Sequence, residues 1–243
     1  MIWLVINRSI DAIVSPDYTL VGHIARAVST ALIVGLFLVL LSRRDRPGRF
    51  GLAPTRRTPA FLGIGAALYA VPFAVGAAIV LVLQLASITF PDGAGAVLPQ
   101  ALLVLALVLL FEAIPEELIF RGYLFSLLAE RLPMWAVVLV QAVAFCLFGA
   151  VIGAAVTFER QLAFFLFSIA LGIIRAVTGS VYATIGFHST FQLLSQLTLN
   201  PQWTSVQLDD PDAWFTDLAF GLAPLVISPL VVLAAVLLRR RRA

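Results

Sequence analysis

An apolar stretch of the chain, residues 111–121 (FEAIPEELIFR), carries an unusual group of charged side chains. Glu117 and Arg121 are four residues apart, in the acid-before-base order that favours pairing on a helix. Glu116 lies on the same helix face as Glu112 and has no basic partner on its own helix. A carboxylate left unpaired in a low-dielectric pocket can act as a general base on water. The alternative is that these charges form a buried ion pair that only fixes helix packing.

A second polar group lies further along the chain, within residues 181–199. His188, Gln192 and Gln196 follow one another at single-turn spacing and form a polar stripe on an otherwise apolar helix. A membrane histidine close to a carboxylate can bind a metal or share a proton. It can also simply form a hydrogen bond to a neighbouring helix, as polar residues in membrane bundles often do.

The composition indicates what kind of fold must position these residues. Hydrophobic residues make up 61% of the chain and charged residues 12%, and the mean hydropathy is +1.04. A charge near the centre of a bilayer costs about 2.5–3.5 kcal/mol on insertion scales, so membrane charges usually face a polar cavity or a partner. We therefore predict an all-α, multi-pass membrane protein in which the charged stretch lines a buried site.

Hydrophobic segments predict seven membrane-spanning helices in a single domain over residues 1–243. Their expected ranges are 20–41, 60–89, 97–128, 134–157, 162–177, 181–199 and 218–238. Pro115 frees a backbone carbonyl one turn earlier, which permits a bend in the third span. The turn between the fifth and sixth spans is expected at residues 178–180, and an outer loop at residues 200–217.

Arginine distribution predicts the orientation of these spans. The chain contains no lysine, and its arginines cluster in residues 42–58 and at 239–242. The positive-inside rule assigns both clusters to the cytoplasm, with the N-terminus outside and the C-terminus cytoplasmic. We interpret the terminal arginines as an anchor beside anionic lipid headgroups and not as a nucleic-acid-binding arm. An all-arginine basic set is typical of a GC-rich genome, which favours a bacterial plasma membrane.

The E-E-x-x-x-R motif of Glu116, Glu117 and Arg121, followed by a Gly-Tyr-Leu sequence, resembles the first motif of a known family. This family is the CAAX-protease and bacteriocin-processing (CPBP, or ABI) intramembrane metalloproteases. His188, with Gln192 in place of a more usual Asn, is similar to the third family motif. The resemblance covers residues 97–199.

The second family motif, F-x-x-x-H, is incomplete in this chain. Phe145 is present, but Gly149 stands where the family has a histidine. Three residues are candidates to replace that ligand: Cys146, His23 and Glu112, of which Glu112 already shares a face with Glu116. The single cysteine excludes an intrachain disulfide and an all-cysteine metal site.

The resemblance implies a role for each matching residue. Glu116 would be the base or a metal ligand, Glu117 and Arg121 would support it, and His188 would be a ligand oriented by Gln192. Phe145 would be a supporting residue. The implied cofactor is a divalent metal, zinc, for which Glu116 and His188 would be ligands. With Glu112 as the replacement for the missing histidine, the site would have the three protein ligands usual at a catalytic zinc.

Three functions remain open at this point. The first is an intramembrane endopeptidase that cleaves a membrane-embedded or lipidated peptide from the cytoplasmic side. The second is a catalytically silent relative that binds a membrane peptide or confers self-immunity to a bacteriocin. A transporter with a proton relay is the third, although the sequence shows no inverted halves.

Overall fold

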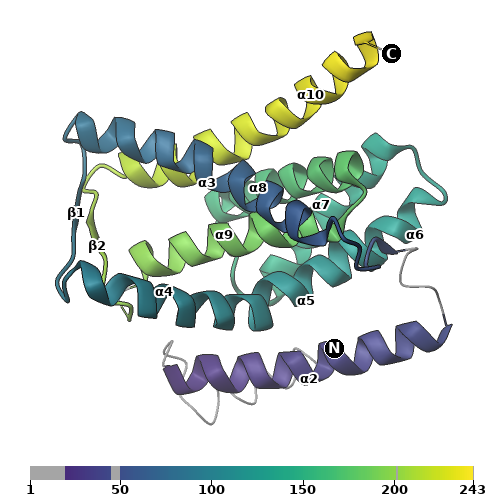
Figure 1. The fold of residues 1–243 in the computed structure, drawn as a ribbon, viewed down its shortest axis with the longest axis horizontal. Helices are drawn as coiled ribbons and strands as arrows, with labels where there is room; N and C mark the ends of the chain where they lie inside the picture. The colour runs from purple at the N-terminus through teal and green to yellow at the C-terminus, as the bar shows by residue number, and fades with distance from the viewer. Residues whose placement is uncertain (1–19, 45–49, 201, 243) are drawn as a thin grey trace.

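The computed structural model describes residues 20–44, 50–200 and 202–242, and in this part the chain forms a bundle of long helices (Figure 1). The α-helices are α2 (Leu20–Arg44), α3 (Thr58–Val82), α4 (Ala94–Val108), α5 (Ile114–Glu117), α6 (Phe125–Ala129), α7 (Met134–Val151), α8 (Phe158–Thr178), α9 (Val181–Leu199) and α10 (Ser228–Arg242). Three segments are wound more widely, as π-helix: η2 (Leu109–Ala113), η3 (Leu118–Leu124) and η4 (Thr216–Ile227).

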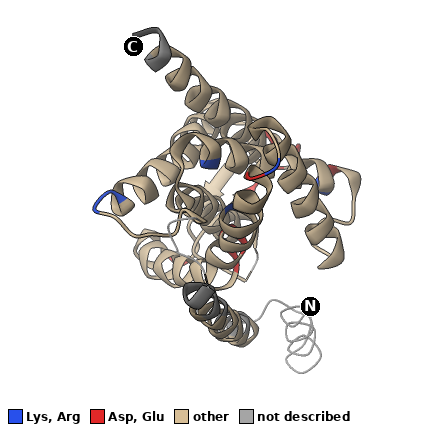
Figure 2. Cartoon of the chain, turned by 90° about the vertical axis from the view of Figure 1, so that its right-hand side faces the viewer, with Lys and Arg blue, Asp and Glu red and all other residues tan. Residues whose placement is uncertain are grey.

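The prediction of an all-α membrane bundle is confirmed. Among the described residues, five helices are long and apolar enough to cross a bilayer: α3, the continuous helix Ala94–Ala129, α7, α8 and the helix Thr216–Leu238. Figure 2 shows how few charged residues the bundle contains. The protein is therefore a multi-pass membrane protein, and the count of seven spans and their orientation stay predictions.

The C-terminal ends of two predicted spans were placed wrongly. Helix α3 ends at Val82 and not at residue 89, because the chain leaves the helix through Gln84, whose φ is 56°. Helix α7 ends at Val151 and not at residue 157, where Gly153 adopts a φ of 81°. In both cases the hydrophobic run continues past the point where the backbone leaves the helix.

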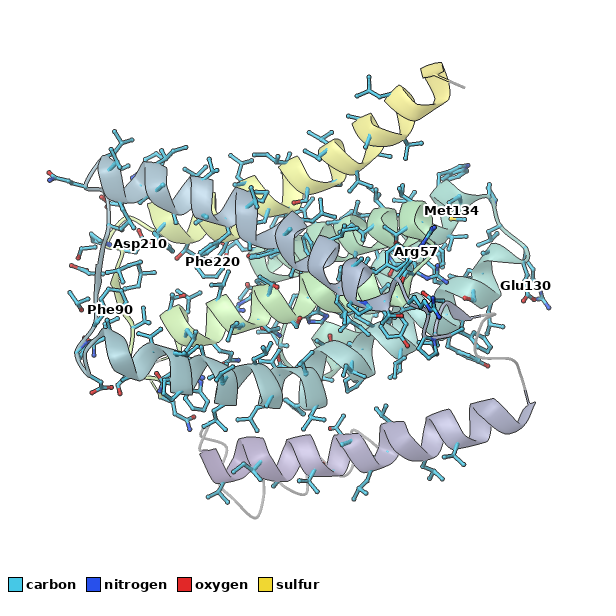
Figure 3. All side chains as sticks on the ribbon, in the orientation of Figure 1. Arg57, Phe90, Glu130, Met134, Asp210 and Phe220 are labelled. Atoms are coloured by element: carbon cyan, nitrogen blue, oxygen red, sulfur yellow. The ribbon has the colours of Figure 1, made fainter. Side chains whose placement is uncertain are left out.

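A small antiparallel sheet joins two of the connections between helices, and the sequence did not predict it. Strand β1 (Ser87–Thr89) pairs with β2 (Gln207–Asp209), with Ile88 opposite Leu208. The prediction of residues 200–217 as loop alone is therefore wrong for β2. Figure 3 places Phe90 and Asp210 at one end of the long axis, and Glu130 and Met134 at the other.

Some predictions concern parts of the chain outside the described residues. These are residues 1–19 and the segment 45–49 within the first arginine cluster. The side chains of His23 and of the terminal arginines 239–242 also lie outside the described part.

A very close helix crossing holds α9 against α3. A Cβ on Gly65 of α3 would lie 1.8 Å from the carbonyl oxygen of Ala183. A Cβ on Gly186 of α9 would lie 2.1 Å from the carbonyl oxygen of Leu62. Only glycine allows the two backbones to approach so closely, as at small-residue crossings in membrane bundles. This crossing fixes the position of α9, which carries His188.

The predicted turn at residues 178–180 is confirmed, and local capping explains it. Gly179 ends α8 in the left-handed conformation, with a φ of 66°. Ser180 then caps α9, because its hydroxyl accepts a hydrogen bond from the backbone N–H of Tyr182 at 3.2 Å. The two helices therefore run antiparallel to one another, and both reach the site.

Candidate functional site

Four charged or titratable side chains converge inside the bundle. Glu116 and Glu117 lie on the single turn of α5, Arg121 on η3 and His188 on α9. Wide turns flank α5 on both sides, and Pro115 in its first turn lacks a backbone N–H. Such π-turns inside α-helices frequently occur at functional sites. The bend expected near Pro115 thus takes the form of two wide turns.

Glu117 is the central acceptor of the site. Its Oε1 accepts a hydrogen bond from Arg121 Nη1 at 3.1 Å and lies 2.8 Å from His188 Nδ1. The side chains of Glu117 and Arg121 are fully buried. Because the oxygen is an acceptor toward the guanidinium, we assign the ring proton of His188 to Nδ1. The lone pair of His188 is then on Nε2.

Glu116 faces the other side of the same imidazole. Its Oε2 lies 3.9 Å from His188 Nε2, which is too long for a direct hydrogen bond. The side chain of Glu116 is 14% exposed, whereas that of His188 is 2% exposed. Two acceptors at this separation can share one water molecule that donates an O–H group to each. The arrangement can therefore hold a water between a carboxylate and an imidazole.

A second layer of polar side chains supports Arg121. Its Nη2 donates to Ser168 Oγ at 2.7 Å, and Ser168 in turn donates to Gln141 Oε1 at 3.2 Å. Gln141 Nε2 donates to the Ser168 carbonyl at 2.9 Å. The Arg121 guanidinium also lies 4.6 Å from the centre of the Phe145 ring, within the range of a cation–π contact. Phe145 therefore contacts the site through Arg121.

Sequence reasoning missed Ser168 and Gln141. Ser168 lies on α8 and Gln141 on α7, both within predicted membrane spans. Polar residues inside a membrane span are candidates for a functional site, and this property could have identified them from the sequence. Phe167, next to Ser168, packs edge-on against the His188 ring with 4.9 Å between ring centres.

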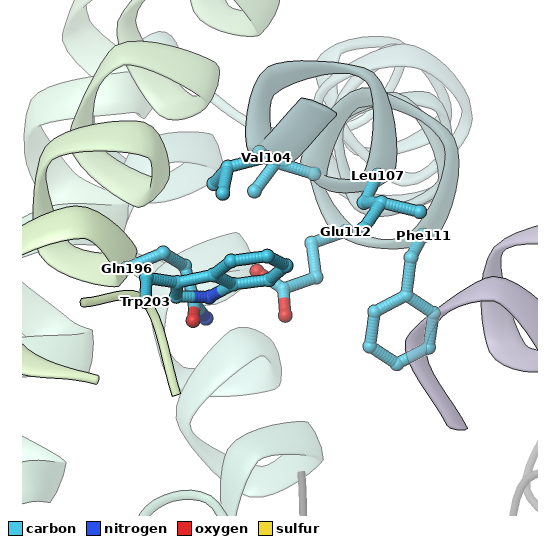
Figure 4. Close-up of a pocket in the computed structure, with 7 residues that line it drawn as sticks. Val104, Leu107, Phe111, Glu112, Gln196 and Trp203 are labelled. Atoms are coloured by element: carbon cyan, nitrogen blue, oxygen red, sulfur yellow. The ribbon is translucent and has the colours of Figure 1, made fainter. Parts of the chain in front are cut away.

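Glu112 lines a small pocket beside the central group, shown in Figure 4. Its carboxylate faces Gln196 and the ring of Trp203. The space inside this pocket is about 10 Å³, roughly what a single water molecule needs and far below the size of a small-molecule site. Gln192 is half-buried one turn after His188, and the described part of the chain shows no hydrogen bond between these two side chains.

The position of the missing histidine is filled by packing. Gly149 is buried, and a Cβ there would lie 2.6 Å from the ring of Phe164 and 3.1 Å from Cβ of Ala155. The thiol of Cys146 points to the Gln161 carbonyl, at 3.6 Å. Neither position provides a ligand to the central group.

The donor atoms around His188 bear on the zinc that the resemblance predicts. Within the described residues, no group of three His, Cys, Asp or Glu side chains could hold a metal ion. Glu116 and His188 provide two donors, and Glu112 does not join them in such a group. A catalytic zinc usually has three protein ligands, so this donor set does not fit one. Zinc stays a prediction.

Comparison with known proteins agrees with the geometry. A family model described as type II CAAX prenyl endopeptidase, Rce1-like, matches residues 98–194. No curated protein and no solved structure matches the chain. The matched segment contains Glu116, Glu117, Arg121 and His188, the four side chains that converge in the bundle. Over residues 98–194, the chain is therefore similar to the Rce1-like family of type II CAAX prenyl endopeptidases.

Proposed function

We propose that this protein is an intramembrane endopeptidase that uses water activated by Glu116. The observation that carries the proposal is the pair formed by Glu116 Oε2 and His188 Nε2, 3.9 Å apart inside the bundle. Glu117 holds the far side of the imidazole through Nδ1 at 2.8 Å, so that Nε2 faces Glu116. A hydrolytic site needs a base and a way to orient water, and these residues supply both.

The proposed reaction is peptide hydrolysis by general acid–base catalysis. Water bound between Glu116 and His188 gives one proton to the Glu116 carboxylate while its oxygen attacks the peptide carbonyl carbon. The C–N bond then breaks, and the proton held by Glu116 passes to the leaving amine. The products are one carboxylic acid and one amine, so a single water molecule is consumed. We assign to Gln192, one turn after His188 on the same helix, the donation of an amide hydrogen to the developing oxyanion.

The proposed substrate is a peptide that reaches the site from the bilayer, embedded in it or attached to it by a lipid. The description of the matching family names prenylated CAAX substrates, and we extend that substrate class to this chain. The apolar exterior of the helices, with exposed residues such as Leu102 and Ile119 on the site-bearing helix, suits a substrate carried in lipid.

A second function is favoured by one observation, the closed position at Gly149. Phe164 occupies the space in which the family histidine would lie, so the site lacks that group. A relative that binds a membrane peptide without cleaving it, or that confers bacteriocin immunity, would keep the ion pair and lose this histidine. This is the alternative that the experiment must separate from the enzyme.

The test measures cleavage of a prenylated peptide by protein reconstituted in liposomes, with products identified by mass spectrometry. We expect Glu116→Gln to lower the rate by about 10²–10⁴-fold, the usual contribution of a general base. Glu159→Gln is the matched control, because Glu159 is exposed at the start of α8, and its rate should equal that of the wild type. Binding of the peptide without cleavage by the wild type would support the silent relative instead.

A further inference from the structure

A buried arginine near the site has no role in the mechanism above. Arg175 lies in the last turn of α8 and is 8% exposed. Within the described residues, no salt bridge joins it to an acidic side chain. Burying a cation without a carboxylate partner is costly, and an apolar residue of similar size would avoid this cost. The contacts that Arg175 makes must therefore offset this cost.

Arg175 binds the backbone of the segment that carries Arg121. Its Nε donates a hydrogen bond to the Arg121 carbonyl oxygen at 2.9 Å. The next carbonyl, that of Gly122, accepts a hydrogen bond from the Ser126 hydroxyl at 2.7 Å. Both carbonyls belong to the π-helical segment η3. Two carbonyls of the wide turn are thus hydrogen-bonded by side chains, one from Arg175 on another helix and one from Ser126 later in the same helix.

Helix α8 contacts the same residue of η3 at two points. Ser168 accepts a hydrogen bond from the Arg121 side chain, and Arg175 donates one to the Arg121 backbone. These two α8 residues are seven apart, two helical turns, and so lie on one face of the helix. Contacts at the side chain and at the backbone together limit both the rotation and the translation of η3 relative to α8.

Arg175 is itself held in place on its other sides. Its guanidinium lies 5.3 Å from the centre of the Phe125 ring. The backbone of Gly51 is so close that a Cβ there would be 2.8 Å from Arg175 Nη2. Gly51 has a φ of 71° and follows Phe50, which is fully buried. The chain between α2 and α3 therefore packs onto the guanidinium and restricts its movement.

From these contacts we infer that Arg175 is a positioning residue: it holds the wide turn η3 so that Glu117, one residue before η3, meets His188 Nδ1. The inference rests on the proposed function for its effect on catalysis, but its effect on the His188–Glu117 contact can be measured without any cleavage. Moving a catalytic group by about 1 Å can cost about 10²-fold in rate, so loss of this hydrogen bond should be visible in both measurements.

The first test uses NMR to measure the protonation and hydrogen bonding of the His188 imidazole. The chain has two histidines, so ¹⁵N-histidine labelling with His23→Gln as the assignment variant isolates the His188 resonances. In the wild type we expect a protonated Nδ1 with the shift of a strong hydrogen bond to a carboxylate. Arg175→Met and Arg175→Gln should weaken this signal or shift it, and Arg175→Lys, which keeps a cationic donor, should restore most of it. Arg131→Met, at an exposed arginine after α6, is the matched control and should leave the signal unchanged.

The second test measures peptide cleavage by the same variants. We expect Arg175→Met to lower kcat by about 10²-fold, with KM within about twofold of the wild type, because geometry and not substrate binding is affected. Arg175→Lys should recover part of kcat. If the wild-type protein does not cleave the peptide, the proposed function is wrong. The His188 Nδ1 resonance still tests the positioning role of Arg175 in that case. The positioning role would be overturned if a folded Arg175→Met or Arg175→Gln variant gave the same His188 Nδ1 signal as the wild type.

Discussion

Glu116 and Glu117 are adjacent in the sequence, but their side chains have different surroundings. Glu117 is fully buried, and one of its oxygens contacts both Arg121 and His188. Glu116 is partly exposed and stands 3.9 Å from the other nitrogen of the same ring. One carboxylate thus holds the ring and the guanidinium in place, and the other is available to react with water.

The two glutamates should therefore differ in what they contribute to stability. Glu117→Gln leaves Arg121 buried without its ion-pair partner, so we expect the free energy of unfolding to fall by about 3–5 kcal/mol. Glu116→Gln keeps that ion pair, and we expect a change within about 1 kcal/mol. Denaturant unfolding in detergent micelles measures both values. Equal losses in the two variants would contradict the division of roles.

Restoring the family histidine at position 149 should not by itself restore a family site. Because a Cβ on Gly149 would clash with Phe164, we expect Gly149→His to lower the free energy of unfolding by about 1–3 kcal/mol and to leave cleavage no faster. Gly95→His, at a glycine with open space around it, is the control and should be close to neutral.

Adding Phe164→Ala to Gly149→His removes the ring that blocks the histidine. We expect the double variant to be more stable than the sum of the two single effects by about 0.5–3 kcal/mol. Strict additivity would show that the clash relaxes in some other way, and that Phe164 does not limit this position.

Residue spacing predicted contacts between side chains on the same helix. It predicted few of the contacts between side chains on different helices. The Glu117–Arg121 pair follows from a spacing of four residues and is confirmed at 3.1 Å. That His188 binds Glu117 through Nδ1 and faces Glu116 with Nε2 depends on how α9 is rotated against α5. Ser168 reaches Arg121 only because α8 packs beside η3. Sequence spacing carries no information on these rotations.

At the scale of elements, the helix that carries the site is not a regular α-helix. The sequence predicts one long span with a bend near Pro115, and the structure shows wide turns at η2 and η3. Hydrogen bonds from Ser126 and Arg175 to carbonyls of η3 help to define the second wide turn. One of these donors comes from another helix, so local propensity alone could not predict it.

The crossing of α3 and α9 gives a prediction at this scale. We expect Gly186→Ala to lower the free energy of unfolding by about 1–3 kcal/mol or more, because its Cβ would meet the backbone carbonyl of Leu62, which cannot rotate away. Gly63→Ala, on α3 with open space around it, should be neutral or stabilising by up to about 1 kcal/mol. Thermal unfolding in detergent compares the two. A tolerated Gly186→Ala would show that the helices can separate without cost.

At the scale of the whole molecule, composition was enough to predict the class of fold. A chain with 61% hydrophobic residues can satisfy its backbone in lipid only as helices or a closed barrel, and the long apolar runs indicate helices. The β1–β2 pair was not predictable in the same way, because its strands are three residues each and lie more than a hundred residues apart. Short strands are defined by their pairing partner more than by their own residues.

The orientation of the bundle is the last prediction, and the single cysteine makes it straightforward to test. In a Cys146→Ser background, Asp212→Cys and Arg131→Cys each place one thiol at an exposed position. Both lie in connections between helices, and Figure 3 shows the neighbouring residues Asp210 and Glu130 at opposite ends of the molecule. Because arginine-rich segments stay in the cytoplasm, a membrane-impermeant maleimide added to intact cells should label position 212 and not position 131. The reverse pattern would place residues 130–133 outside, and would mean that the arginine clusters do not set the orientation of this protein.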